Sequence, residues 1–214
     1  EIYLKNNINL KIDNAYLMDK MYSKNNNYCF NYILPLNKNK ILFEFTVFSN
    51  KSVSLPWIEN ELLINIKKYN LGSYKIVRRE YGKLPMGFTK NNKTLKSPNY
   101  YQAGTAAGAI RASSGYAFLR IQDWAEKCAI NIKKKGNLIN HHKEKNMLYF
   151  IDRIFLIAIS NKTVSCPVIF FNFSKKIFVD TFIKFMLGKV NFFDCIKVIL
   201  SMPKRVFLRC LFKI

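Results

Sequence analysis

Two strand-forming runs near the start of the chain constrain its fold more than any other feature. Residues 28–34 are rich in aromatic and aliphatic side chains and end at Pro35, and residues 41–48 have the same character. The polar residues 37–40 between the two runs are typical of a turn. We therefore expect an antiparallel pair of strands inside a strand-rich region that covers residues 1–50.

Apolar side chains repeat at helical spacing through much of the remaining chain. Residues 54–69 form such a pattern, whereas residues 74–80 have the character of a short strand. A further helix is expected from Ser114 to about Asn131, and Gly136 follows as a stop signal. Four amphipathic helices are expected near the C-terminus, at residues 145–160, 177–187, 191–201 and 203–213. Together these elements predict an α+β fold.

The chain is strongly basic, with a formal net charge of +22 from 35 Lys and Arg against 13 Asp and Glu. Proteins that bind nucleic acids favour Arg, because its side chain makes bidentate contacts with bases and phosphates, but only 7 of the basic residues here are Arg. No nucleic-acid-binding motif is present either. We expect an anionic membrane surface as the partner, where Lys acts as a point charge, and no nucleic acid. Five scattered cysteines form no CxxC pair, so neither a metal site nor a disulfide framework is expected.

A run of small residues, 103–116, is the segment with the most specific pattern. Its glycines and alanines let the backbone approach a ligand closely, and the predicted helix start behind them offers N–H groups to an anion. The pyrophosphate or the reduced ring of a flavin suits such a site. The alternative is a tight loop that packs on a neighbouring helix, which is the commoner role of a small-residue loop on its own.

Four segments, in their order and spacing, resemble the lycopene cyclase family, which is related to the flavoprotein monooxygenases. They are residues 43–46, with an acid in a strand, residues 79–86, the small-residue run 103–116, and residues 199–203. The resemblance extends over residues 17–212. It implies an isomerase of carotenoid biosynthesis that closes the linear ends of lycopene into β-ionone rings. It also implies FAD in its reduced form and in a non-redox role, with NADPH as the reductant.

The resemblance places the chemistry on particular residues. Glu44 would be the acid that protonates the substrate, because its strand neighbours are apolar and would keep the carboxyl protonated. Arg79 and Glu80 would position the flavin or join the proton path. Alternatively, Glu44 is a solvated strand residue, and Arg79 and Glu80 form a surface ion pair. The residues expected to contact the flavin are Gly104, Thr105, Ala106, Ala107, Gly108, Arg111, Ser113, Ser114, Gly115 and Tyr116.

The resemblance also divides the chain by role. Residues 1–102 would be a sheet-rich substrate-binding layer, residues 103–135 the flavin-contacting loop and helix, and residues 136–214 a helical cap, as part of a flavoprotein-monooxygenase-like fold. The N-terminal dinucleotide-binding half of the family, with its GxGxxG motif, has no counterpart here, and the chain begins with Glu1. We therefore expect a fragment, or a chain that needs this missing half as a partner.

Two other functions remain open from the sequence. One is a related FAD-dependent monooxygenase or prenyl reductase, and the other is a basic module that binds membranes or nucleic acid. For the cyclase we expect a cytoplasmic protein peripheral to the inner membrane, because lycopene resides in the bilayer and the chain has no run of about 18 apolar residues. His141 and His142 stand in a Lys-rich segment and are expected to be exposed to solvent.

Overall fold

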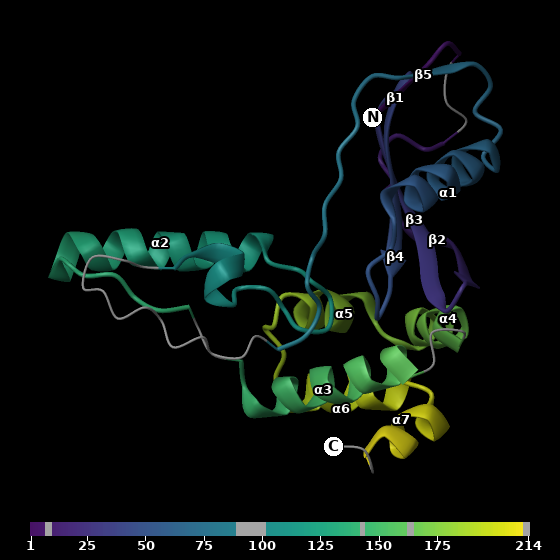
Figure 1. Ribbon diagram of the computed structural model, residues 1–214. Helices are drawn as coiled ribbons and strands as arrows, with labels where there is room; N and C mark the ends of the chain where they lie inside the picture. The colour runs from purple at the N-terminus through teal and green to yellow at the C-terminus, as the bar shows by residue number, and fades with distance from the viewer. Residues whose placement is uncertain (7–9, 89–101, 142–143, 162–164, 212–214) are drawn as a thin grey trace. The chain divides into compact units, whose positions relative to one another are not determined.

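The computed structural model describes residues 1–6, 10–88, 102–141, 144–161 and 165–211 (Figure 1). The chain forms two compact units. One, the sheet unit, comprises Glu1–Gly82 and Ser160–Phe170, and the other, the helical unit, comprises Lys83–Ile159 and Phe171–Ile214. The three regions expected from the sequence were defined by role, and that division stays a prediction.

The sheet unit contains five antiparallel strands in the order β2-β3-β4-β1-β5. Their bounds are β1 Ile2–Leu4, β2 Tyr16–Lys24, β3 Asn27–Asn37, β4 Lys40–Phe48 and β5 Tyr74–Ile76. The predicted antiparallel pair is confirmed as β3 and β4, with Tyr32 opposite Glu44 and Leu34 opposite Leu42. The expected strand at residues 74–80 is shorter than predicted, because only its first three residues pair with β1. The prediction of a mixed α+β fold is therefore confirmed.

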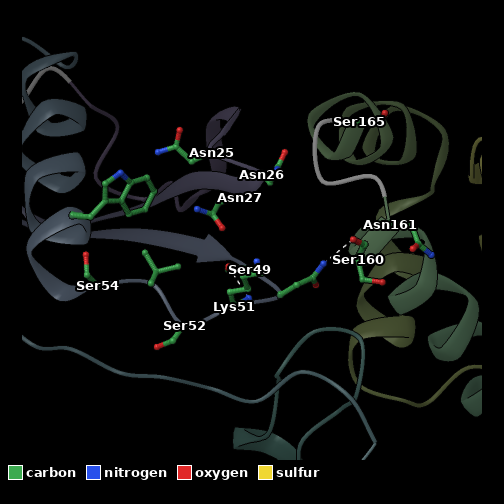
Figure 2. A pocket seen from close by; sticks show the side chains of 13 residues that line it. Asn25, Asn26, Asn27, Ser49, Lys51, Ser52, Ser54, Ser160, Asn161 and Ser165 are labelled. Atoms are coloured by element: carbon green, nitrogen blue, oxygen red, sulfur yellow. Dashed lines mark hydrogen bonds between the residues drawn. The ribbon is translucent and has the colours of Figure 1, made fainter.

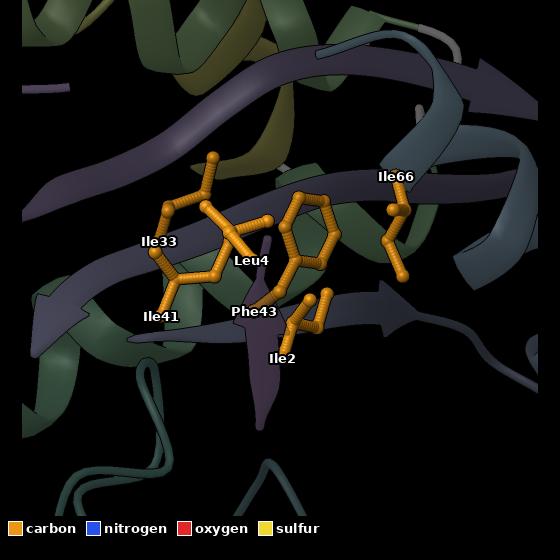
Figure 3. Packing of buried hydrophobic residues seen from close by; sticks show 6 residues of the cluster. All are labelled: Ile2, Leu4, Ile33, Ile41, Phe43 and Ile66. Carbon is orange, nitrogen blue, oxygen red and sulfur yellow. The ribbon is translucent and has the colours of Figure 1, made fainter. Parts of the chain in front are cut away.

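Helix α1, Leu55–Lys67, covers one face of the sheet and begins as predicted, with Ser54 before it and Pro56 in its first turn. Pro is favoured in a first turn because its missing N–H needs no partner there. Apolar side chains from the sheet and from α1 form the core of this unit (Figure 3), namely Ile2, Leu4, Ile33, Ile41, Phe43 and Ile66. Since side chains alternate along a strand, the residues between Ile41 and Phe48 divide between this core and the opposite face.

A polar network fixes α1 to the edge strand β2 and to its neighbour β3. The buried Glu61 carboxylate accepts hydrogen bonds from the Tyr22 hydroxyl at 2.8 Å and from the Lys24 ammonium at 2.5 Å. Asn65 donates to the Tyr22 hydroxyl at 2.8 Å, and Asn31 donates to Asn65 at 3.3 Å. These contacts join three elements through groups that would be costly to leave unpaired inside the protein.

The helical unit largely follows the predicted pattern. Its helices are α2 Phe118–Lys135, α3 Asn146–Asn161, α5 Val179–Met186, α6 Phe192–Ser201 and α7 Lys204–Leu211, and α3 ends within the sheet unit. Gly136 ends α2 in a left-handed conformation, and Asn191 forms a capping box with Asp194 at the start of α6. None of the described helices combines the length and the apolar character needed to cross a bilayer.

One helix start was predicted wrongly, and one helix was missed. Helix α2 begins at Phe118 and not at Ser114, because Gly115 adopts φ +71° and a left-handed residue interrupts a right-handed helix. Helix α4, Cys166–Lys176, was not predicted, since its apolar residues are consecutive and show no helical period. The boundary between the two units falls inside α4.

Candidate functional site

The face of the sheet opposite α1 is aromatic at one end and open at the other. Tyr28 and Phe30 of β3 are fully buried, and the Phe170 ring stacks on Tyr28 at 5.1 Å between centroids. Further along the same face, Leu34 has 37% of its surface exposed and Glu44 is exposed. This open end presents a carboxyl group beside apolar side chains.

Glu44 lies on β4 directly opposite Tyr32, and the Thr46 hydroxyl donates to its carboxylate at 2.9 Å. The expected apolar surroundings are absent, because alternation gives Glu44 apolar neighbours along the strand but leaves the carboxyl itself in solvent. Burial and the charge of Glu44 raise the pKa of Tyr32 to about 12. The Tyr32 phenol is therefore neutral at pH 7. The acid role of Glu44 stays a prediction.

Arg79 and Glu80 follow β5 and are exposed. The Arg79 guanidinium lies 3.9 Å from the Glu59 carboxylate of α1, and Glu80 pairs with Arg78. The contact with α1 places Arg79 toward the covered side of the sheet, whereas Glu44 lies on the open side. The structure therefore gives these two residues ion pairs with other partners, and their role in the chemistry stays a prediction.

The small-residue segment forms a short 3-10 turn, Gly104–Ala107, followed by a left-handed Gly108 with φ +81°. Residues 104–108 and 114–116 are exposed or half-buried, whereas residues 111–113 are buried between them. The Arg111 N–H donates to the Tyr116 carbonyl at 2.9 Å and closes a tight turn around Gly115. The segment thus offers two stretches of accessible backbone on either side of a buried anchor.

The anchor is the ion pair between Arg111 and Asp152 of α3, both with no exposed side-chain surface. Arg111 donates from Nε to Oδ2 at 3.2 Å and from Nη2 to Oδ1 at 2.9 Å, and Ser113 donates to Oδ1 at 2.8 Å. The family resemblance predicts Arg111 and Ser113 as flavin contacts, but both side chains bind Asp152 and are buried. Asp152 was missed, although an acid in the apolar stripe of a helix is a signal for such a pair.

His141 supports the same segment from another side. Its Nε2 accepts a hydrogen bond from the Gly104 N–H at 3.2 Å, and its ring stacks on Trp124 at 4.2 Å. Burial, with the nearby Arg120 charge, lowers the pKa of His141, so the ring is neutral at pH 7. The expectation that His141 is solvent-exposed was wrong, because the ring packs against α2. His142 lies outside the described residues.

The accessible part of the segment fits the flavin that the sequence predicts. Residues 104–108 carry small side chains and are exposed or half-buried, and α2 begins directly after the turn. The first N–H groups of a helix have no partner within it, so they can bind an anionic or electron-rich group. A positive φ at Gly104, Gly108 and Gly115 explains why glycine stands at these three positions.

A cavity of about 860 Å³ lies in the sheet unit and is lined mainly by amides and hydroxyls (Figure 2). The Asn50 amide donates across it to the Ser160 carbonyl at 2.7 Å. Its other lining residues are Asn25, Asn26, Asn27, Ser49, Lys51, Ser52, Val53, Ser54, Trp57, Asn161 and Ser165. The residues that the sequence predicts for the site are absent from this lining, and its polar surface does not suit a polyene.

The chain matches a protein-family model. A family model described as "Lycopene cyclase protein" matches residues 4–184. The matched range includes Glu44, Arg79, Glu80 and the whole small-residue segment. No curated protein and no solved structure matches the chain.

Proposed function

The chain belongs to the lycopene cyclase family, and from this premise we propose that it supplies the substrate layer and part of the flavin site of a lycopene β-cyclase. Membership of the family supports a role in carotenoid cyclisation. The observation that carries the more specific proposal is the open sheet face, where the Glu44 carboxyl stands beside Leu34, Leu42 and Tyr32.

Glu44 is the proposed acid. Its proton adds to the terminal double bond of lycopene, a tertiary carbocation forms, and the next double bond attacks to close the ring. A proton then leaves the carbon next to the new cation and returns to the Glu44 carboxylate, so the net reaction is an isomerisation. A polyene lying on Leu34 and Leu42 would remove water from the carboxyl, and such desolvation favours its protonated form.

The backbone of residues 104–108 and the first turn of α2 are the proposed contacts for FAD. Reduced FAD, with NADPH as the source of its electrons, would supply negative charge that favours a carbocation. The residues of this chain hold and orient that group. Arg111 and Ser113 would hold the segment in shape through their buried hydrogen bonds with Asp152. The adenosine side of the cofactor would be held by the dinucleotide-binding half that the family possesses.

We also propose that the protein acts at the cytoplasmic side of the inner membrane, as a peripheral protein. The junction of α4 and α5 supports this, because exposed Lys175 and Lys176 are followed by Phe178 and Val179, which are 73% and 72% exposed. Lysines beside exposed apolar side chains favour an anionic bilayer surface. Such contact would give the site access to a substrate that dissolves in lipid.

The reaction can be tested with the full-length natural protein, reduced FAD and lycopene in D₂O. The proposal predicts a cyclic carotene that carries a single deuterium for each ring closed, since the acid proton exchanges with solvent. A product that gains oxygen would indicate a monooxygenase, and one that gains two hydrogens would indicate a prenyl reductase. Either product would overturn the cyclase proposal.

A further inference from the structure

The buried carboxylate of Asp152 binds two side chains of the small-residue segment at once. Arg111 donates to both of its oxygens, at 3.2 and 2.9 Å, and Ser113 adds a third hydrogen bond at 2.8 Å. The Phe185 ring of α5 lies over the guanidinium, with 3.9 Å between the ring centroid and Cζ. Three donors from residues two apart in sequence therefore converge on one acceptor of α3.

This arrangement is a costly way to join a loop to a helix. Two charges leave water, and an apolar pair of similar volume often gives equal or greater stability. Arg111 also keeps a buried Nη1 without a hydrogen-bond partner among the described residues. An ion pair with three directed hydrogen bonds holds residues 111–113 in a single position. An apolar contact does not, because it lacks directed bonds.

The position of Arg111 determines the accessible backbone on its C-terminal side. Its carbonyl accepts hydrogen bonds from the N–H groups of Ser114 and Gly115, at 3.3 and 2.9 Å, and its own N–H donates to Tyr116. Arg111 therefore also makes the backbone hydrogen bonds that close the turn leading into α2. A shift of Arg111 would move residues 114–116 and, through them, the first turn of α2, which the proposed function assigns to FAD.

We propose that Asp152 is a positioning residue for the cofactor-contacting segment. It acts through Arg111 and Ser113, without touching the cofactor, and holds residues 111–116, which lead into α2, in the shape that binds flavin. This inference rests on the proposed function for its ligand, but the anchoring itself can be measured without any ligand.

The decisive variant is the double substitution Arg111→Met and Asp152→Leu, which removes the pair without leaving a buried charge alone. Amide hydrogen exchange of residues 104–116 is measured by mass spectrometry, together with the melting temperature and FAD affinity. We expect near-wild-type melting, exchange about tenfold faster in this segment and FAD binding about tenfold weaker, because local opening no longer breaks directed bonds. The matched control is Lys127→Met with Asp123→Leu, which removes an exposed ion pair of α2. This control should change neither the hydrogen exchange of residues 104–116 nor the FAD affinity.

Wild-type exchange and wild-type FAD affinity in a folded double variant would overturn the proposal and leave an ordinary buried ion pair. If the double variant does not fold, Ser113→Ala decides the question, because it removes one directed bond and no charge. Faster exchange at residues 111–116 supports the anchoring, and unchanged exchange overturns it. If the wild-type protein binds no FAD, the proposed function fails, while the exchange data still decide whether Asp152 positions the segment.

Discussion

At the residue scale, the proposed acid Glu44 lies on the open sheet face without the apolar cover that a bound substrate would provide. The Glu44 side chain is exposed and accepts a hydrogen bond from Thr46. Its neighbours across and along the strands are Tyr32, Leu34 and Leu42. A bound polyene would cover this group with hydrocarbon, so substrate binding and activation of the acid would occur together.

His141 gives a prediction for pH dependence at the same scale. Its pKa is lowered in the folded chain from the ordinary value of 6.5, mainly by burial, so the unfolded chain binds this proton more readily. The free energy of unfolding should therefore fall as pH drops from about 6.5 through the folded pKa, and then level off. Urea unfolding at a series of pH values should show this trend in the wild-type protein.

His141→Gln supplies the comparison, since the Gln amide oxygen can accept from Gly104 but does not titrate. The variant should lose the part of the pH dependence that begins near pH 6.5. Identical pH profiles for the wild-type protein and the variant would show that His141 is not held neutral by the fold.

At the element scale, the position of α1 depends on a buried carboxylate as well as on the apolar core. Glu61 is 2% exposed and binds Tyr22 and Lys24 of β2. Burial alone would raise the pKa of Glu61, but the hydrogen bonds from Lys24 and Tyr22 outweigh it, and the pKa lies below the ordinary value of 4.5. This contribution to stability is present above pH 4.5 and is lost as pH falls through the folded pKa.

Glu61→Gln tests this contact. At pH 7 the variant should lose about 1–3 kcal/mol of unfolding free energy, because Lys24 loses its charged partner and the buried network is incompletely paired. Glu59→Gln on the same helix is the control, and it should change stability by less than about 0.5 kcal/mol, because both partners of its ion pair with Arg79 are exposed. Equal stability of the two variants in urea unfolding at pH 7 would contradict the assignment.

A helix or strand could be predicted where the residues of its own segment determine it, and not where contacts with distant residues do. Strands β3 and β4 were predictable because their aromatic and aliphatic runs flank a polar turn, and α6 was predictable from its apolar period. The start of α2 was not, since the left-handed conformation of Gly115 depends on the turn around Arg111. The Asp152 contact joins residues 41 positions apart in sequence, so the acid in the apolar stripe of α3 signals a buried partner but does not identify Arg111.

At the scale of the whole molecule, the proposed chemistry divides between the two units. The sheet unit carries Glu44 on its open face, and the helical unit carries the small-residue segment with its anchor on α3. The order of motifs along the chain made the family predictable, and the match over residues 4–184 confirms it. The same order could not show that Arg111 and Ser113 are buried, because burial depends on how distant helices pack.

Membrane contact gives a prediction at this scale. Lys175→Gln with Lys176→Gln should weaken binding to vesicles of phosphatidylglycerol and phosphatidylethanolamine about tenfold or more, since each Lys near an anionic surface contributes about 1 kcal/mol. Co-sedimentation measures the bound fraction. Lys133→Gln with Lys134→Gln, at the exposed end of α2, removes the same charge and should have a smaller effect. Equal losses in the two pairs would contradict a specific surface at the junction of α4 and α5.

Pigment analysis of lycopene-accumulating bacterial cells tests the claim that Glu44 is the acid of a cyclase. The cells express the full-length natural protein, its Glu44→Gln variant, or the Glu59→Gln control. The wild-type protein and the control should form cyclic carotene, whereas Glu44→Gln should form it about 100-fold more slowly while accumulating to the same level, as expected for loss of a general acid. Cyclic carotene at the wild-type rate from Glu44→Gln would contradict the claim.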